Sequence, residues 1–369
     1  MRIRWIIFTA VLLNPVLGDG QDRYTIPLGK ANSSLAVPVM AERDGVVYVA
    51  YRSFDLLRRS EQLQLLAYDL DSHKELRHAT ISVPKVQGAR ATNGLTLSKG
   101  GNLLAYVEIH SPSLILILSA MNFSEIHRSS AMPFTDADYR REFVGFDDDD
   151  RLSFMSFSRD VPRFIRVSAT DFKVVSDTKA TSLTKAVYSD YLVWDPIIGK
   201  FWLPSNDGNV YQFNEDGELT GEKLTTEIHQ LGVGAISLGQ SGVIAFYAMV
   251  SRGAVASYTN HKSQALELPC SPRPYGASND HAYVGAICIT QPGGLPEAGG
   301  DRILTSDFLL IRTAGLQVVW RQKMSVLGAG AKDYFGWASA VIEHRDKKMW
   351  VVAPTKLPEL VVYEMSLPE

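Results

Sequence analysis

Histidines, serines and carboxylates are the side chains in this sequence that most often carry out chemistry, and their spacing limits what they can do. The eight histidines are scattered, without the HxH or HExxH spacing that holds a catalytic metal. The chain has no GxSxG sequence to present a serine nucleophile. Neither metal-dependent nor serine-based hydrolysis is supported, and we expect no metal and no cofactor.

A run of four aspartates, Asp147 to Asp150, is the sharpest concentration of charge. Carboxylate oxygens are ligands that Ca²⁺ prefers, so the run is a candidate calcium site. It lacks the glycine and the following bidentate Glu of a calcium loop, and it lies between the apolar residues Phe146 and Leu152. We therefore favour the alternative, which is the solvated tip of a β-hairpin.

The chain has two cysteines, Cys270 and Cys288. An even number of cysteines in an exported chain permits a disulfide, and we expect these two to form one. The alternative is a pair of buried thiols that act as small apolar side chains. Without a CxxC sequence, a zinc or thiol-redox centre is not expected.

The elements that must position these residues are short strands and tight turns, as the segment from Phe201 to Thr220 illustrates. Val210 and Gln212 alternate with Tyr211, which is the period of two that places side chains on opposite faces of a strand. Asp216 and Gly217 then provide a tight hairpin turn, because both residue types tolerate left-handed backbone angles. The segment predicts three strands joined by two turns.

The same strand–turn–strand pattern recurs along the whole chain. Seven inner hairpins are predicted, at Pro38 to Tyr51, Thr92 to Glu108, Phe143 to Phe157, Tyr191 to Pro204, Gly234 to Val250, Tyr275 to Thr290 and Trp337 to Ala353. Outer hairpins follow the first six, at Gln64 to Ile81, Leu114 to Ile126, Arg163 to Val175, Val210 to Leu219, Ala254 to Leu268 and Phe308 to Trp320. Four strands per unit, repeated roughly every 45 to 60 residues, predict an all-β fold, a single β-propeller with seven four-stranded blades.

The last unit lacks an outer strand, because only four residues follow Met365. The segment from Arg23 to Gly29 has no hairpin partner of its own, so it is a candidate for that strand and for closing the ring. The alternative is a disordered N-terminus of the mature chain. The propeller is predicted to occupy residues 19–369.

Three runs of sequence indicate a family. VVYVAY (Val46 to Tyr51), LLAYDLDSHKEL (Leu65 to Leu76) and NVYQFNEDGEL (Asn209 to Leu219) resemble exported bacterial β-propellers of the YVTN and WD40-like repeat type. The resemblance concerns architecture and covers most of the mature chain. It implies a propeller fold, but no catalytic residue is carried over, because propellers host many unrelated functions.

The first 18 residues predict a signal peptide, with Arg2 and Arg4 before an apolar run from Trp5 to Leu13. The alternative is an uncleaved anchor, although the run is short for a membrane-spanning helix. We expect a secreted or periplasmic protein with no transmembrane span once the signal is removed. A net charge of -3 argues against nucleic acid as a partner.

In propellers of the type that this chain resembles, ligands commonly meet the loops joining the second strand to the third and one blade to the next. Mapped onto these units, this face is basic and aromatic, whereas the opposite hairpin tips carry Asp44, Asp147 to Asp150, Asp280 and Asp346. The candidate binding residues are Arg58, Arg59, Lys85, Arg90, His110, Arg159, Arg163, Arg273, Tyr275, His281, Lys332, Tyr334 and Trp337.

Arginine forks bind carboxylates and aromatic rings stack on sugars and peptides, so this face suits an acidic protein or a small anionic or carbohydrate-like ligand. We therefore favour a monomeric, non-catalytic binding protein. The alternative is a periplasmic lactonase-like hydrolase or isomerase that uses His and Arg near the central channel.

Overall fold

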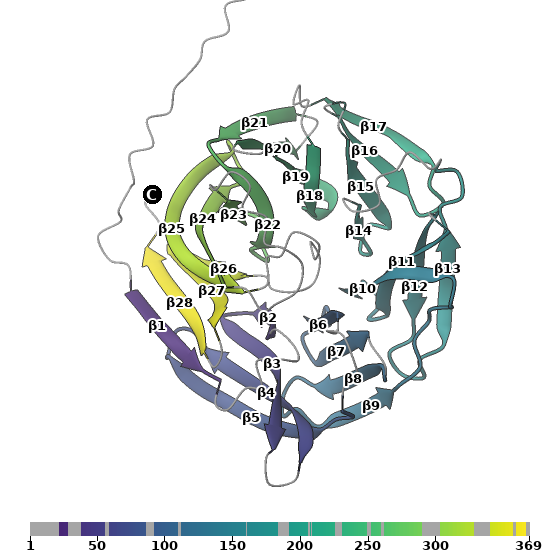
Figure 1. Cartoon of the computed structure of the whole chain (residues 1–369), viewed down its shortest axis with the longest axis vertical. Helices are drawn as coiled ribbons and strands as arrows, with labels where there is room; N and C mark the ends of the chain where they lie inside the picture. The colour runs from purple at the N-terminus through teal and green to yellow at the C-terminus, as the bar shows by residue number, and fades with distance from the viewer. Residues whose placement is uncertain are drawn as a thin grey trace, which may run out of the picture.

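The protein is a ring of seven β-sheets in the computed structural model (Figure 1). The structure describes residues 22–28, 38–55, 59–85, 92–109, 112–159, 161–183, 192–205, 207, 209–225, 231–248, 252–259, 262–289, 303–327, 340–356 and 359–366. Each sheet has four antiparallel strands, so the predicted all-β fold with seven four-stranded blades is confirmed. The described helical structure is one 3-10 turn at Gly239–Ser241.

The blades follow one another in chain order. Blade 1 holds β2 (Val39–Arg43), β3 (Val46–Asp55), β4 (Ser60–Asp69) and β5 (Lys74–Ser82), and blade 2 holds β6 (Thr92–Leu97), β7 (Leu103–Ile109), β8 (Leu114–Ser119) and β9 (Glu125–Ser129). Blade 3 holds β10 (Asp138–Phe146), β11 (Leu152–Ser158), β12 (Val161–Val167) and β13 (Val174–Lys179), and blade 4 holds β14 (Val193–Asp195), β15 (Lys200–Pro204), β16 (Asn209–Asn214) and β17 (Leu219–Thr225).

The second half of the ring repeats this order. Blade 5 holds β18 (Leu231–Ser237), β19 (Gly242–Ala248), β20 (Gly253–Thr259) and β21 (Lys262–Leu268), and blade 6 holds β22 (Ser271–Ala277), β23 (Tyr283–Ile289), β24 (Ile303–Arg312) and β25 (Gln317–Leu327). Blade 7 holds β26 (Val341–Arg345), β27 (Lys348–Lys356), β28 (Glu359–Ser366) and, from the other end of the chain, β1 (Asp22–Pro27).

The strand β1 is the outer strand of blade 7 and pairs antiparallel with β28, with Asp22 opposite Glu364 and Pro27 opposite Glu359. Figure 1 shows the purple β1 beside the yellow β28. Ile26 is 1% exposed and packs with Trp350 and Val352. The N-terminal segment therefore completes the last blade and closes the ring.

The hydrophobic core is divided into seven clusters, each between two neighbouring blades. In β7, Leu104 and Tyr106 pack toward blade 1, while Ala105 and Val107 pack toward blade 3. Both faces of an inner strand are thus buried, because each blade is covered on two sides. Trp202 fills the layer between blades 4 and 5.

Several predicted hairpin boundaries need correction. The outer hairpin of blade 6 runs from Ile303 to Leu327 rather than from Phe308 to Trp320. The inner hairpin of blade 3 begins at Asp138 rather than at Phe143, because β10 continues past a register shift between Tyr139 and Glu142. The shift bulges Arg140 and Arg141 out of the pairing, and Arg140 has a left-handed φ of 44°. Consecutive arginines at a bulge break the alternating pattern from which strands are predicted.

Candidate functional site

The ring has two ends, which differ in the connections they carry. The side that we call the turn end carries two turns of each blade. One joins the first strand to the second, and the other joins the third strand to the fourth. We call loop end the side with the connections that join the second strand to the third and one blade to the next. Because strands are antiparallel, these two sets of connections lie at opposite ends of the ring.

The described candidate residues divide between three places. Arg59, Lys85 and Arg159 are exposed at the loop end, whereas Arg163, Arg273 and Tyr275 lie within strands near it. Six others lie outside the described residues: Arg58, Arg90, His110, Lys332, Tyr334 and Trp337. Part of the predicted face thus lies at or near the loop end, on the separate blades 1, 3 and 6.

His281 lies at the turn end instead. It occupies the turn between β22 and β23, the first and second strands of blade 6, with a left-handed φ of 58°. Its backbone N–H donates to the carbonyl of Ser278 at 2.9 Å. The sequence assignment of His281 to the loop end was wrong in position, because the short turn after Ala277 is a first-to-second connection.

Arg159 is the exposed arginine of blade 3. The strands β11 and β12 are joined by a two-residue turn, since Ser158 pairs with Val161, and Arg159 takes a left-handed φ of 52° there. That geometry belongs to tight hairpins and holds the side chain outward. Among the described residues Arg159 has no ion-pair partner, so its charge faces solvent.

Arg163 is four residues further on but is buried. Its guanidinium donates to both oxygens of Asp177, at 2.7 and 2.6 Å, and also to Asp138. Burial alone would raise the pKa of Asp138, but hydrogen bonds from Thr135 and the charge of Arg163 outweigh it and hold that pKa below its usual value. Arg163 thus ties the first, third and fourth strands of blade 3 together.

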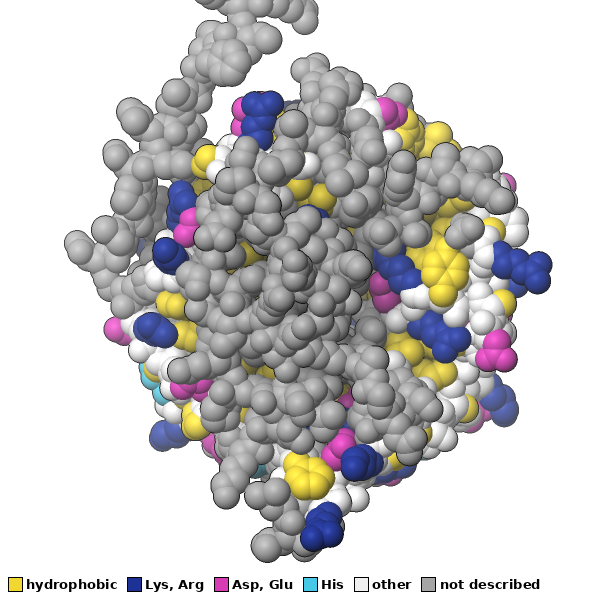
Figure 2. All heavy atoms as spheres, in the orientation of Figure 1, with side chains coloured by type: hydrophobic (Ala, Val, Ile, Leu, Met, Phe, Trp, Pro, Cys, Tyr) yellow, Lys and Arg dark blue, Asp and Glu magenta, His cyan; other side chains and the backbone are white. Residues whose placement is uncertain are grey.

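Beside Arg159, the bulge of β10 adds residues that the sequence reading missed. Tyr139 is 43% exposed, and its ring lies 6.0 Å from that of Phe157. The Arg140 guanidinium lies over Phe157, 5.3 Å from the ring centre, and forms an ion pair with Glu142. Figure 2 shows dark-blue cationic and yellow apolar side chains next to one another over the blade of β10, β11 and β12.

Arg141 completes this group. It donates to the backbone carbonyls of Asp138 and Thr135, both at 3.0 Å, and lies over the ring of Phe134. Carbonyl oxygens hold a guanidinium in place without neutralising its charge. The signal in the sequence was the consecutive Tyr-Arg-Arg just before an apolar strand. We call Tyr139, Arg140, Arg141 and Arg159 the blade-3 rim.

The candidate residues of blade 6 are less accessible. Tyr275 is 4% exposed and packs edge-on against Phe308 in the layer between blades 6 and 7. Burial raises the pKa of its hydroxyl, as expected for a phenol removed from water. Arg273 is half-buried on the same inner strand. Tyr275 is therefore a packing residue in this structure.

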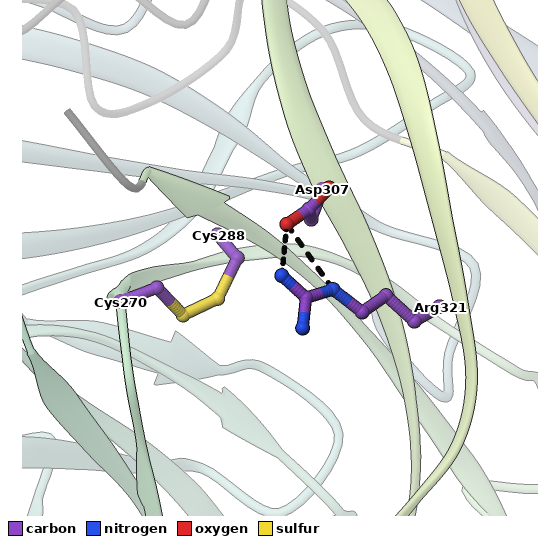
Figure 3. The surroundings of a disulfide bond; sticks show 4 residues. All are labelled: Cys270, Cys288, Asp307 and Arg321. Carbon is purple, nitrogen blue, oxygen red and sulfur yellow. Dashed lines mark hydrogen bonds and ion pairs between the residues drawn. A yellow bond between two sulfur atoms is a disulfide. The ribbon is translucent and has the colours of Figure 1, made fainter. Parts of the chain in front are cut away.

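The two cysteines cross-link blade 6 near its loop end (Figure 3). Cys270 directly precedes β22 and Cys288 lies in β23; they form the expected disulfide, with 5.4 Å between the Cα atoms. Cys288 pairs in the sheet with Asp307 of β24, whose carboxylate accepts hydrogen bonds from Arg321 of β25. The disulfide, the sheet pairing of Cys288 with Asp307 and the ion pair of Asp307 with Arg321 thus form one connection across this blade.

A buried ionic group connects blades 1 and 2. Arg52, Glu61 and Glu108 are each no more than 2% exposed. Arg52 donates to Glu108 at 2.6 Å, to Glu61, and to the carbonyl of Pro84 at 3.0 Å. Burial opposes the charge of Arg52, but its hydrogen bonds to Glu108 raise its pKa overall. Because both carboxylates are held by one guanidinium and hidden from solvent, we assign the group to structure.

At the turn end, polar contacts run from blade to blade. Arg345 of blade 7 pairs with Asp71 of blade 1 at 2.7 Å. Arg43 of blade 1 donates to the carbonyl of Lys99 of blade 2 at 2.7 Å, and Lys99 in turn pairs with Asp148 of blade 3 at 2.9 Å. The aspartate run Asp147 to Asp150 thus serves as a contact between blades at a hairpin tip.

Around the rest of the turn end the contacts continue. Arg166 of blade 3 donates to Glu215 of blade 4 at 2.8 Å, and Ser237 of blade 5 donates to Asp195 of blade 4 at 2.6 Å. His344 of blade 7 lies 2.7 Å from Asp280 of blade 6. In the described part of the chain, no group of His, Cys, Asp or Glu has the geometry to hold a metal ion.

Arginines at the turn end are mostly held in ion pairs, whereas the exposed Lys74 and Lys262 of that end have no ion-pair partner among the described residues. Arg43, Arg151, Arg166 and Arg345 at the turn end are each in an ion pair. Exposed cations at the loop end, namely Arg59, Lys85, Arg159 and Arg252, have no ion-pair partner among the described residues. An unpaired surface cation remains available to an anionic partner.

Comparisons with known proteins agree with this architecture. No family model matches the sequence, and none of the curated proteins does. The β-propeller domain of Cps50 (Swd1) from Myceliophteria thermophila aligns with a TM-score of 0.52 and 12% identity over 94% of this chain and all of that one. The RRP9 WD40 repeats align with a TM-score of 0.54 and 12% identity, over 93% and 97% of the two chains.

The structure of U3-55K aligns equally well, with a TM-score of 0.54 and 12% identity over 93% of this chain and 98% of that one. Identities this low show the fold alone. The chain is a seven-bladed β-propeller. It resembles WD40-like repeat proteins in architecture, and the connections between its strands lie at the two ends of the ring.

Proposed function

We propose that this protein is an exported, non-catalytic propeller that binds an anionic partner, an acidic protein segment first of all, through its loop end. The observation that carries the proposal is the set of exposed loop-end cations without ion-pair partners among the described residues. Several cations at the turn end, among them Lys99, Arg166 and Arg345, are by contrast paired within the molecule. A protein partner also agrees with the scaffold role that WD40-like propellers commonly serve.

The blade-3 rim is the part of this face where a contact is best defined. Arg159 supplies a guanidinium without an ion-pair partner among the described residues, and Arg141 supplies a second one that two carbonyls hold in place. Tyr139 adds an exposed ring beside them. Arginine forks bind carboxylates through paired hydrogen bonds, and tyrosine adds contact area at low entropic cost. Together they suit an acidic peptide that carries an apolar side chain.

The proposal predicts that an acidic peptide, with alternating Glu and Leu residues, binds more weakly when Arg159 and Arg141 are replaced by alanine. We expect a loss of roughly tenfold in Kd, measured by fluorescence anisotropy. Lys173→Ala at the turn end is the matched control and should leave Kd unchanged, because Lys173 is paired with Asp171. If the double arginine variant bound the peptide as tightly as Lys173→Ala does, the loop end would not be the binding site.

Export is part of the proposal and has its own test. If residues 1–18 are a signal peptide, the protein recovered from periplasm or medium begins near Asp19. Intact-mass measurement gives the start directly. Retention of the N-terminal 18 residues would favour an anchored protein. In the described part of the chain, no helix is long and apolar enough to cross a membrane.

A further inference from the structure

The turn end of blades 1 to 4 carries most of the exposed apolar side chains. Eight large apolar residues are well exposed in the described part of the chain, and Tyr139 at the loop end is one of them. The other seven lie at the turn end of these four consecutive blades. Scattered exposed hydrophobics are normal on proteins, whereas a gathering on one side marks an interaction surface.

Five of the seven lie at the beginning of an outer strand. They are Leu76 in β5, Ile126 in β9, Val174 and Val175 in β13, and Leu219 in β17. Each is between 43% and 52% exposed. Four consecutive blades thus repeat an apolar residue at the same place.

In three of these blades the exposed residue is an extra residue in the strand. The pairing of β4 with β5 skips Leu76, that of β8 with β9 skips Ile126, and that of β12 with β13 skips Val175. A bulge of this kind turns its side chain away from the sheet. The repeat therefore builds a row of outward apolar side chains along the rim.

The fold does not require apolar residues at these positions. Blade 5 begins its outer strand with the exposed Lys262 and Ser263, and blade 7 begins its outer strand with the exposed Asp22 and Arg23. The remaining two apolar residues extend the row onto neighbouring turns: Met121, 78% exposed, in blade 2 and Ile197, 58% exposed, in blade 4. The apolar rim is thus confined to one side of the ring.

At the turn end of blades 3 and 4, carboxylates outnumber cations: Asp147 to Asp150, Asp171, Asp195, Glu215, Asp216 and Glu218 against Arg151, Arg166, Lys173 and Lys200. In blades 3 and 4 the turn-end cations Arg151, Arg166 and Lys173 are each paired with a carboxylate. Asp216 is exposed and has no ion-pair partner among the described residues. A second copy of this rim would meet it with like charges, whereas a basic apolar surface complements it.

We infer that the turn-end rim of blades 1 to 4 is a second docking surface, occupied by a partner protein segment that is apolar on one face and basic around it. This surface is separate from the loop end and does not depend on the function proposed for it. Occupied at both ends, the ring would connect partners of opposite charge.

A helical peptide of Leu and Lys with one apolar face is a direct probe, and the same peptide with Glu in place of Lys is its charge control. We expect the Lys peptide to bind, and the Ile126→Ser, Val175→Ser double variant to weaken it by roughly tenfold. Ser263→Ala, at an exposed position in the outer strand of blade 5 outside the rim, is the control and should leave binding of the Lys peptide unchanged. Calorimetry measures the binding of each peptide to the wild type and to each variant. Met121→Ser provides an independent variant of the rim.

Four results would overturn the inference. The first is that the Lys peptide binds the double variant as tightly as the wild type, which would show that charge alone attracts the peptide to the protein. The second is that the Glu peptide binds the wild type as tightly as the Lys peptide does, which would show that the rim does not select a basic partner. Sedimentation of the chain as a dimer that the double variant abolishes would make a second copy the occupant. Binding to anionic vesicles but not to the peptide would assign the rim to a lipid surface. Unchanged circular dichroism and Tm of the variants ensure that the fold is intact in each case.

Discussion

Arg159 and Arg163 show how differently two nearby arginines can serve one blade. Arg159 is exposed at a hairpin turn, whereas Arg163 is buried among Asp138 and Asp177. Removing a buried charge partner leaves the remaining carboxylates uncompensated, which is strongly destabilising. We expect Arg163→Ala to lower the free energy of unfolding by about 3 kcal/mol, and Arg159→Ala to leave it within about 0.5 kcal/mol. Denaturant melts of the two variants provide the comparison, and similar melts would contradict the burial of Arg163.

The sequence could not separate these two arginines. Both lie at or next to a predicted hairpin, and the sequence predicts both as binding residues. What distinguishes them is the position of two carboxylates, and Asp138 is far away along the chain and was not recognised as part of β10. Burial of a charge is decided by such long-range pairing, whereas exposure at a tight turn is a local property.

Glu42 predicts a dependence of stability on pH. Burial, and a hydrogen bond to the carboxyl of Glu343 on the neighbouring inner strand, raise its pKa to about 8, against the lowering effect of the Gly45 N–H. Asp44 adds to the rise, while Asn279 donates to the Glu42 carboxylate and Arg345 lies 2.8 Å from Glu343.

The direction in which stability changes with pH depends on whether the folded or the unfolded chain holds the proton of Glu42 more tightly. Above about pH 5 the unfolded chain releases the proton of Glu42, but the folded chain keeps it, so stability falls as pH rises toward 8. We expect Tm of the wild type to decrease across this range, and that of Glu42→Gln, which cannot ionise, to decrease less. Glu267→Gln, at an exposed position of β21, is the control. Parallel curves for Glu42→Gln and the wild type would show that the folded chain does not retain a proton on Glu42 across this range.

At the scale of elements, the contact between β22 and blade 7 depends on one glycine. Gly276 has a φ of 114° at a register shift of β22, and a Cβ added there would run into the backbone carbonyl of Ala340. Gly315, in the turn between β24 and β25, has a φ of 77° with open space around it. The two glycines share backbone strain and differ in available room.

We therefore expect Gly315→Ala to cost about 1 kcal/mol and Gly276→Ala at least about 2 kcal/mol more. The first substitution strains only the backbone, whereas the second also forces two blades apart. Equilibrium unfolding in urea measures both. Equal losses would show that Ala340 shifts freely and that the contact between blades 6 and 7 is loose.

The blades themselves were largely predictable, because a hairpin is a local structure. Asp44-Gly45 and Asp216-Gly217 mark turns that the structure has at the same residues, both glycines with positive φ. The bulge at Arg140 and Arg141 and the row of exposed residues at Leu76 and Ile126 were missed. Bulges disturb the alternation on which strand prediction rests, so the outward residues that they create are hidden from it.

For the whole molecule, closure by β1 decides stability. Ile26 is buried between blades 7 and 1, while its neighbour Thr25 is exposed. We expect Ile26→Ala to cost about 2 to 4 kcal/mol and to release β1 from β28, which leaves an unpaired strand edge. Thr25→Ala is the control and should have little effect. Hydrogen exchange of the β28 amides measures the release of β1 directly. If the β28 amides of Ile26→Ala stayed fully protected, the loss of stability would not come from opening of the β1–β28 pair.

The pairing of β1 with β28 also decides how the ring responds to force. Asp22 lies opposite Glu364, so the beginning of β1 and the end of β28 leave blade 7 on the same side. Tension between the two chain ends therefore breaks the hydrogen bonds of this pair one after another rather than all at once. A ring held together by seven packed layers is mechanically weakest at this single pair of strands, and a pull on its ends would open it there first.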